Sequence, residues 1–443
     1  MNSPWCRTLS VSAMAAVPLA IGLALASPQA SAAGFQLNEN SPQGMGRAYA
    51  GMAAAPGDCA VVANNPAAMT DLGAGCVSAA ATVIDFHAKF HGGGTDLLGD
   101  PLTGGNGGDA GVTKAVPALF FAKPITSEWT LGAGISVPFG LQTEYPDGWV
   151  GRYNALLSKL ESIALTFSAA YKVSDELSLG GSVIAQRTSA TLSQAINFGT
   201  ILAGPTGGQL LPQEADGFGQ LKGDDWGYGF DLGLLWKPTP ADRIGLNFHS
   251  QVDQTLSGKG TFLVPSNIVP LLAPAFTDTD GSADFDTPAF ASLDWWHTVD
   301  DQLSFGAHLG YTHWSSFKTL VVHYANPAQP DSTTAFDYKD AWFFSVGGDY
   351  KLDPNWTLRA GVAYDETPTT TAHRDPRVPD NNRTWLSLGV SYGTGGPWQF
   401  DLGYAHLFVN DASINTMSPT FDTLVGSTKG SADLLGVTAQ YRF

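Results

Sequence analysis

Cysteine and positive charge are scarce in this chain of 443 residues. It contains 3 cysteines, and 22 Lys and Arg residues stand against 40 Asp and Glu residues, which gives a formal net charge of −18 at pH 7. Such acidity argues against nucleic acid as a partner and against a polybasic membrane-surface patch, because both need clustered positive charge. No paired histidines accompany the cysteines, so the sequence predicts neither a metal site nor another cofactor.

Long apolar runs and catalytic motifs are also missing after the N-terminus. No segment beyond the first 32 residues approaches about 18 consecutive apolar residues, so no later transmembrane helix is expected. There is no G-x-S-x-G or H-E-x-x-H motif, and the glycine-rich run 104–108 has no following helix to bind phosphate. The sequence therefore predicts no enzyme, with a barrel-shaped phospholipase or protease as a minor alternative.

Residues 1–32 have the three parts of a secretory signal. Arg7 supplies the positive start, residues 11–26 form the apolar segment, and Ala30-Ser31-Ala32 is an A-x-A cleavage site. Cleavage would make Ala33 the first mature residue. A transmembrane anchor is the alternative, which the short apolar segment disfavours.

Cys59 and Cys76 are the pair that remains once Cys6 leaves with the signal. An exported chain reaches an oxidising compartment in which disulfides form. A bond between the two would close a loop of roughly 18 residues and contribute on the order of 3 kcal/mol. Two buried free thiols are the alternative.

The segment that follows the signal, residues 33–71, is rich in Gly and Ala and has neither strand nor helix periodicity. Some forty residues are too few to build a core of their own. The segment nevertheless carries apolar side chains at Phe35, Leu37, Met45, Tyr49, Met52 and Met69. We therefore predict that residues 33–76 fold as a plug inside a container formed by residues 77–443.

Alternation of apolar with small or polar residues dominates the chain from Val77 onward. In the last segment Leu435, Val437, Ala439 and Tyr441 share one strand face. Many such segments reach about ten residues, above the usual five or six of globular strands. They number roughly fourteen, near 77–90, 113–123, 128–139, 161–173, 176–194, 224–237, 242–259, 284–297, 302–316, 338–351, 355–365, 383–393, 397–409 and 431–443.

The two faces of these strands predict a transmembrane barrel. The apolar face is continuous and ends in Trp, Tyr or Phe, whereas the other face is Gly, Ser, Ala and Thr, as in a barrel with a lipid-facing band and aromatic girdles. Lipid cannot hydrogen-bond an open sheet edge, so the sheet must close. A lumen this wide needs a plug. The predicted fold class is therefore all-β, a transmembrane antiparallel barrel of about 14 strands with an N-terminal hatch in its lumen; a soluble secreted all-β protein is the alternative.

The start of the mature chain resembles the hatch of the FadL family of outer-membrane channels, at residues 33–39 and at Gly46-Arg47-Ala48-Tyr49. Asn65, Pro66 and Ala67 match the family's NPA turn. Further similar segments are 339–341, 355–361, 365–368, 378–380 and 383–387. The resemblance covers essentially the whole mature chain.

This resemblance implies a monomeric channel of a Gram-negative outer membrane for passive uptake of long-chain fatty acids or, in relatives, aromatic hydrocarbons. A ligand would enter an apolar pocket and leave through a gap beside a kinked third strand, at Pro138, Phe139 and Gly140, with Phe35 and Leu37 against it. An ordinary strand end there, and a general porin as the function, are the alternatives.

The resemblance also implies partners and head-group ligands. The partners are hydrophobic small molecules, membrane lipid and lipopolysaccharide, and the barrel insertion machinery, which would recognise Phe443. Fatty-acid members bind the carboxylate with basic residues, but the corresponding positions here are near Gln194 and Thr334. The remaining basic candidates are Arg152, Lys159, Arg187 and Arg359. Arg359 has lumen-facing parity but could pair with Asp365 or Asp401, so a neutral hydrocarbon or aromatic ligand stays open.

Overall fold

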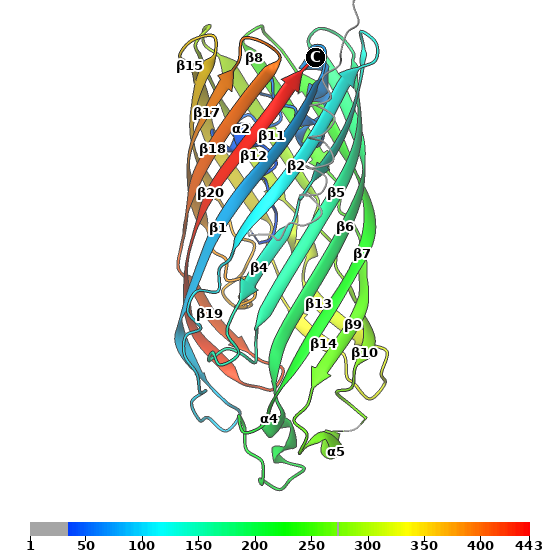
Figure 1. The fold of residues 1–443 in the computed structure, drawn as a ribbon, viewed down its shortest axis with the longest axis vertical. Helices are drawn as coiled ribbons and strands as arrows, with labels where there is room; N and C mark the ends of the chain where they lie inside the picture. Colours follow the sequence, from blue (N-terminus) through cyan, green and yellow to red (C-terminus); the bar gives the residue numbers. More distant parts are fainter. Residues whose placement is uncertain (1–33, 273) are drawn as a thin grey trace, which may run out of the picture.

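The strands form one antiparallel sheet that closes into a tall barrel (Figure 1). The computed structural model describes residues 34–272 and 274–443, so the predicted signal and Ala33 lie outside the described residues. Strand β1 (Cys76–Thr95) pairs along its whole length with β20 (Thr423–Arg442). This pairing joins the first wall strand to the last and closes the sheet into a barrel.

The strands between these two vary in length from four to 21 residues. The other strands are β2 (Thr113–Pro124), β3 (Trp129–Ser136), β4 (Gly140–Glu144), β5 (Leu157–Lys172), β6 (Leu177–Asn197), β7 (Asp216–Trp236), β8 (Asp242–His249), β9 (Thr255–Leu263), β10 (Thr279–Asp284), β11 (Phe290–Thr298), β12 (Leu303–Thr312), β13 (Thr319–Tyr324), β14 (Ser332–Ala335), β15 (Ala341–Lys351), β16 (Trp356–Asp365), β17 (Arg383–Gly393), β18 (Trp398–Val409) and β19 (Ala412–Met417). The helices are α2 (Pro42–Met45), α3 (Val61–Asn64), η1 (Pro66–Asp71), α4 (Phe198–Ala203), α5 (Val269–Leu272) and η2 (Trp314–Ser316). None of these helices is long and apolar enough to cross a membrane.

The wall has fourteen strands once segments that lie in line are joined, which confirms the predicted fold class. The segments in line are β3 with β4, β8 with β9, β10 with β11, β12 with β13, β14 with β15, and β18 with β19. Short turns gather at one end of the barrel and long connections, including α4 and α5, at the other (Figure 1).

The interruptions correct several predicted strand bounds. The predicted strand 242–259 ends at His249 and resumes at Thr255, and an isolated bridge joins Val252 to Thr287 across the break. The break folds inward, because a Cβ at Gly227 of β7 would meet the Val252 side chain at 2.5 Å. Only a glycine at position 227 leaves room for the inward segment between β8 and β9. The alternation along a single strand does not reveal such an inward segment.

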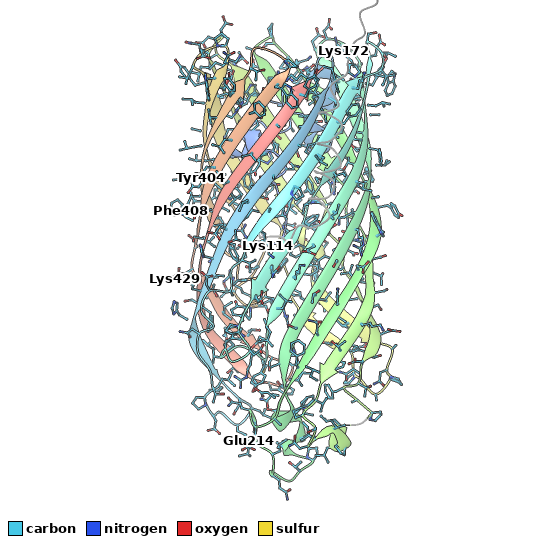
Figure 2. All side chains as sticks on the ribbon, in the orientation of Figure 1. Lys114, Lys172, Glu214, Tyr404, Phe408 and Lys429 are labelled. Carbon is cyan, nitrogen blue, oxygen red and sulfur yellow. A yellow bond between two sulfur atoms is a disulfide. The ribbon has the colours of Figure 1, made fainter. Side chains whose placement is uncertain are left out.

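The outside of the wall is covered with large apolar side chains. On β7 the exposed residues run from Trp226 to Trp236, and Tyr228 between them is 75% exposed. Figure 2 shows Tyr404 and Phe408 projecting from the outside of the barrel. Such exposure would be costly in water and is expected of a surface that contacts lipid.

Residues 34–75, here called the lumen segment, lie inside the barrel (Figure 1). Its helix α2 packs against β17 and β18, and η1 packs against β5, β6 and β7. Small wall residues make this approach possible: a Cβ at Gly403 would lie 2.3 Å from the Pro42 carbonyl oxygen, and one at Gly361 would lie 2.2 Å from that of Arg47. The glycines on the polar strand faces therefore form the surface on which the lumen segment rests.

The lumen segment is fastened to the wall by a covalent bond and by its NPA turn. The predicted disulfide between Cys59 and Cys76 is present and ties the segment to the first residue of β1. Asn65 accepts a hydrogen bond from the Ala67 backbone N–H at 3.1 Å, and its amide donates to the Leu234 carbonyl of β7 at 3.0 Å. Pro66 follows as the first residue of η1.

Candidate functional site

The third wall strand breaks between β3 and β4, and the start of the lumen segment pairs with the break. Residues 34–40 are called the N-terminal arm. The Leu37 N–H donates to the Pro138 carbonyl at 2.8 Å, and the Gly140 N–H donates to the Phe35 carbonyl at 2.8 Å. Pro138 has no N–H for the sheet ladder, and the Phe139 N–H donates to Ser162 Oγ of β5 at 2.8 Å. The arm thus supplies backbone pairing at the point where the strand bends.

The same break leaves a gap in the wall. Pairing between β2 and β3 covers Leu119 to Pro124 of β2, and among the described strands residues 113–118 of β2 pair with β1 alone. A hydrogen bond of 3.0 Å from the Glu144 N–H to the Ala110 carbonyl closes the gap toward the long loops. The sheet is therefore interrupted laterally beside the arm.

Phe35 lies at the centre of a buried aromatic cluster. Its ring centroid is 4.5 Å from that of Trp314, 5.5 Å from Phe317, 5.6 Å from Phe285 and 6.1 Å from Phe139. Its neighbours Trp314 and Phe317 meet it edge to face, the arrangement that aromatic rings favour. With 3% of its surface exposed, Phe35 anchors the arm by apolar packing.

An apolar chamber lies beside this cluster, toward the loop end of the barrel. Its lining includes Phe35, Leu141, Leu160, Leu192, Leu221, Leu256, Phe285, Phe317, Leu320, Phe336 and Val378. Its cavity volume of about 70 Å³ is far below the few hundred Å³ of typical ligand pockets. The chamber, with Phe35 in its lining, is therefore smaller than such a pocket.

A larger cavity of about 790 Å³ adjoins the chamber on the loop side. The residues that line both cavities are Leu192, Leu221, Leu320, Phe336 and Arg377. Other apolar residues of its wall come from the long connections and include Leu202, Leu272, Phe276 and Phe421. A ligand in the outer cavity would thus be separated from the inner chamber by a few side chains.

Arg377 is the basic side chain that lies where the two cavities meet. Its guanidinium donates to Gln194 Oε1 at 2.6 Å, to the Ser193 carbonyl at 3.3 Å and to Ser158 Oγ at 3.3 Å. The Asp375 carboxylate lies 3.9 Å from its Nε. Burial lowers the pKa of Arg377 and raises the pKa of Asp375, but an arginine stays protonated in a protein. Arg377 therefore offers a fixed positive charge beside apolar walls.

Of the basic residues considered from the sequence, Lys159 borders the chamber and Arg152 and Arg187 do not, and all three form ion pairs. Arg152 pairs with Asp216 at 2.8 Å, Lys159 with Glu161 at 2.7 Å, and Arg187 with Asp224 at 2.8 Å. Lys159 and Arg187 share the outward face of their strands, and the Arg187 side chain is 47% exposed. The prediction that Arg187 lies at the ligand pocket is therefore corrected, because its strand parity points the side chain away from the lumen.

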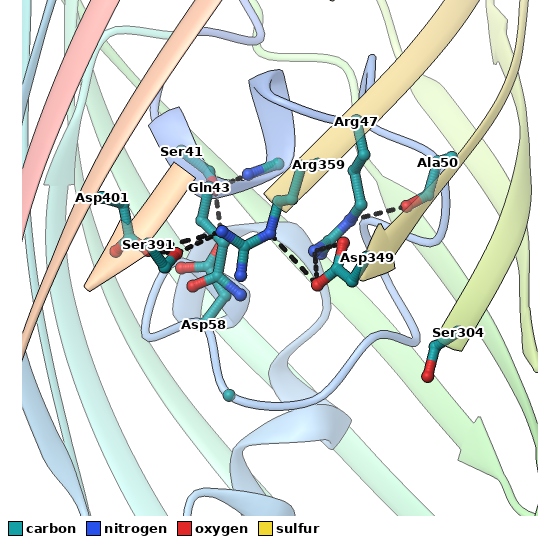
Figure 3. A network of polar contacts seen from close by, with 12 residues as sticks. Ser41, Gln43, Arg47, Ala50, Asp58, Ser304, Asp349, Arg359, Ser391 and Asp401 are labelled. Atoms are coloured by element: carbon teal, nitrogen blue, oxygen red, sulfur yellow. Dashed lines mark hydrogen bonds and ion pairs between the residues drawn. The ribbon is translucent and has the colours of Figure 1, made fainter. Parts of the chain in front are cut away.

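Arg359 does face the lumen, but it lies at the turn end beside the lumen segment (Figure 3). Its guanidinium is 3.1 Å from Asp349 and 3.7 Å from Asp401. Arg47 of the lumen segment shares Asp349, at 3.4 Å. The predicted pairing with Asp401 is present and that with Asp365 is not, because Arg383 lies 3.8 Å from Asp365. Arg359 thus links the wall to the lumen segment rather than lining the chamber.

Sequence reasoning missed Arg377 and the ring of aromatic residues around Phe35. Arg377 lies between Pro376 and Pro379 in the long connection 366–382. Two nearby prolines restrict the backbone and could have marked this arginine as rigidly held. Trp314 lies within the predicted strand 302–316 and Phe317 directly follows it, whereas the strand ends at Thr312 and a turn of 3-10 helix turns Trp314 inward.

A closed membrane barrel with a folded segment in its lumen and an apolar chamber behind a broken wall strand defines the class of plugged outer-membrane transport barrels. The chain belongs to the outer membrane protein transport family (OMPP1/FadL/TodX), whose family model matches residues 23–443. It is accordingly an outer-membrane protein of Gram-negative bacteria.

Similar proteins span almost the full length of the chain. The long-chain fatty acid transport protein of Escherichia coli K12 is 31% identical over 451 residues, which cover 96% of this chain and 98% of the relative. The crystal structure of a Pseudomonas aeruginosa FadL homologue has a TM-score of 0.88 at 32% identity and covers 93% of this chain and 100% of its own. The Ralstonia pickettii toluene transporter TbuX, at 24% identity and a TM-score of 0.66, covers 92% of this chain and 99% of its own and shares the fold.

Proposed function

We propose that the protein is a passive outer-membrane channel for hydrophobic compounds, with long-chain fatty acids as its main substrates. The ligand is captured in the outer cavity, moves into the inner chamber and leaves sideways through the wall gap between β2 and β4. The observation that carries this proposal is the double position of Phe35, which lines the chamber and is hydrogen-bonded to the break that borders the gap.

Capture follows from the size and chemistry of the outer cavity. A cavity of about 790 Å³ is within the range that holds a medium-sized ligand. Each methylene group that moves from water into such an environment contributes about 0.8 kcal/mol. Transfer inward requires more room than the inner chamber has at about 70 Å³, and withdrawal of Phe35 would supply that room.

Withdrawal of the arm would also open the exit. The arm pairs with Pro138 and Gly140, so its movement removes the backbone that fills the space behind the gap. Because no step consumes energy, a ligand would move down its own concentration gradient. The lumen segment, as a hatch, would keep the rest of the barrel closed to ions and polar solutes throughout.

Arg377 favours an anionic ligand over a neutral one. A charged donor held between two apolar cavities suits a carboxylate whose tail lies in either of them. A hydrogen bond to a charged group contributes about 1.5–3 kcal/mol. Uptake of a neutral aromatic hydrocarbon, as the name of the Ralstonia pickettii relative states for that protein, is the second candidate and would not depend on Arg377.

The test is uptake of radiolabelled oleate and of toluene by Escherichia coli that lacks its own long-chain fatty acid transport protein and carries this chain. We expect restored oleate uptake. Arg377→Gln should lower oleate uptake about tenfold or more and leave toluene entry unchanged, and Arg377→Lys should restore part of the loss. The matched control is Arg187→Gln, which removes an arginine from the outward face.

Failure to restore uptake of either compound would refute the channel. An equal loss of oleate and toluene uptake in Arg377→Gln would refute the anion preference alone. A general porin would instead conduct ions in planar bilayers at every insertion, which a plugged barrel should not do. Two further expectations, the monomeric state and recognition of Phe443 by the insertion machinery, remain predictions.

A further inference from the structure

Two pairs of lysines face each other directly across neighbouring strands on the outside of the barrel. Lys222 of β7 is the register partner of Lys259 of β9, and Lys89 of β1 is the register partner of Lys429 of β20. All four residues are exposed and share the outward parity of their strands. These two doublets are unexpected in a chain with 22 basic and 40 acidic residues, because like charges directly opposite in a sheet destabilise it.

Nearby acids do not neutralise the first doublet. In the described part of the chain neither Lys222 nor Lys259 has an acidic side chain within ion-pair distance. Asp224, two residues along β7, is bound to Arg187 at 2.8 Å. Asp280 of β10 is the register partner of Lys259 on its other side. The doublet and its neighbours therefore keep a net positive charge.

The second doublet is partly compensated. The Lys89 ammonium lies 3.7 Å from the Asp109 carboxylate, and the same carboxylate oxygen lies 2.8 Å from Nδ1 of His87. Lys429 has no ion pair within the described residues, and Asp433 on the same strand is bound by His406 at 2.8 Å. Asp85 of β1 lies on the same outward face and is the register partner of Asp433, so Asp85, Asp109 and Asp433 offset the charge of this doublet.

Both doublets lie just beyond the lipid-facing band, on the side of the long loops. On β7 the band runs from Trp236 to Trp226, about ten residues, which at about 3.3 Å per residue and a tilt near 40° spans about 25 Å, the height of such bands. Lys222 lies about 10 Å beyond Trp226 on the same geometry. Lys429 likewise lies on the loop side of Phe408 (Figure 2).

We propose that the first doublet, Lys222 with Lys259, binds a phosphate group of the outer-leaflet glycolipid, lipopolysaccharide. The position is that of the outer-leaflet head groups, and two ammonium groups balance the charge of about −1.5 to −2 of a phosphate monoester. A bound phosphate also removes the cross-strand repulsion between Lys222 and Lys259. The inference concerns the outward faces of β7 and β9; Lys222 also borders the inner chamber, so the test reads lipid binding and not uptake.

The test measures binding of lipid A to the purified full-length barrel in detergent at low salt. The probes are bisphosphorylated lipid A, the same lipid with its phosphates removed, and inorganic phosphate. We expect the phosphates to tighten binding at least tenfold, and Lys222→Gln combined with Lys259→Gln to weaken binding of bisphosphorylated lipid A several-fold. Asp280→Asn should tighten it at least twofold. Heat-modified migration on gels verifies that each variant is folded.

Lys172→Gln is the matched control, because Lys172 lies at the opposite, short-turn end of the barrel (Figure 2) and pairs with Asp175 at 2.6 Å. It should leave the affinity within twofold of the wild type. Equal affinity for lipid A with and without phosphates would overturn the proposal, as would a Lys222 and Lys259 double variant that binds like the wild type. Displacement of lipid A by low-millimolar inorganic phosphate would assign the site to free phosphate and reject the lipid.

Discussion

Removing the Phe35 side chain should release the N-terminal arm without unfolding the barrel. Phe35→Ala deletes a ring that contacts Trp314, Phe317, Phe285 and Phe139 at centroid distances of 4.5 to 6.1 Å. A buried Phe→Ala substitution costs about 3–5 kcal/mol. The backbone bonds of the arm to Pro138 and Gly140 remain, so the loss falls on the docking of the arm alone.

The size of this loss can be measured by amide hydrogen exchange. The N–H groups of Leu37 and Gly140 are protected while the arm is docked, and their exchange follows the opening equilibrium. A loss of about 3 kcal/mol corresponds to roughly a hundredfold faster exchange, at 1.36 kcal/mol for each factor of ten. Amides of β7, which packs against η1 and does not pair with the arm, should keep their wild-type rates.

Phe230→Ala is the control, because Phe230 is an aromatic residue on the lipid-facing surface, with 45% of its area exposed. It should leave the Leu37 and Gly140 amides unchanged. Exchange of these amides within threefold of the wild type in Phe35→Ala would show that backbone bonds hold the arm and that Phe35 does not. Faster exchange throughout the barrel would instead show general destabilisation.

Two further predictions concern the lumen segment. Replacing Cys59 and Cys76 together by Ser should weaken its attachment by up to about 3 kcal/mol and speed amide exchange in residues 59–75, and a reductant should reproduce this in the wild type but not in the variant. Burial raises the pKa of Glu39 from 4.5 to about 7, so the folded state holds a proton that the unfolded chain releases, and stability falls as pH rises from about 4.5 to about 7. Glu39→Gln should remove this loss of stability, which is at most about 3 kcal/mol. Amide exchange in the arm should then depend less on pH than in the wild type, and an unchanged pH profile would contradict the prediction.

Much of the architecture is determined by sequence features that act locally. Apolar alternation assigns each residue to the lipid or the lumen face, and the short turns set the strand count, because both depend on neighbours along one strand. The pairing of Cys59 with Cys76 followed from their being the two cysteines left in an oxidising compartment. The break at Pro138 was implied by the family resemblance and fits the inability of proline to join a sheet ladder, although the alternation alone placed Pro138 inside the strand 128–139.

The tertiary structure alone decides which residues form the chamber. Strand parity distinguishes Arg359, which faces the lumen, from Arg187, which faces outward. Parity does not give the height of a residue along the barrel axis, because that height depends on the stagger of the tilted strands. The inward folds after His249 and Thr312 and the course of the loop that carries Arg377 depend on contacts between distant segments. Long-range packing of this kind leaves no periodic trace in the sequence, so the aromatic cluster and the charge at its entrance became visible only once the sheet had closed.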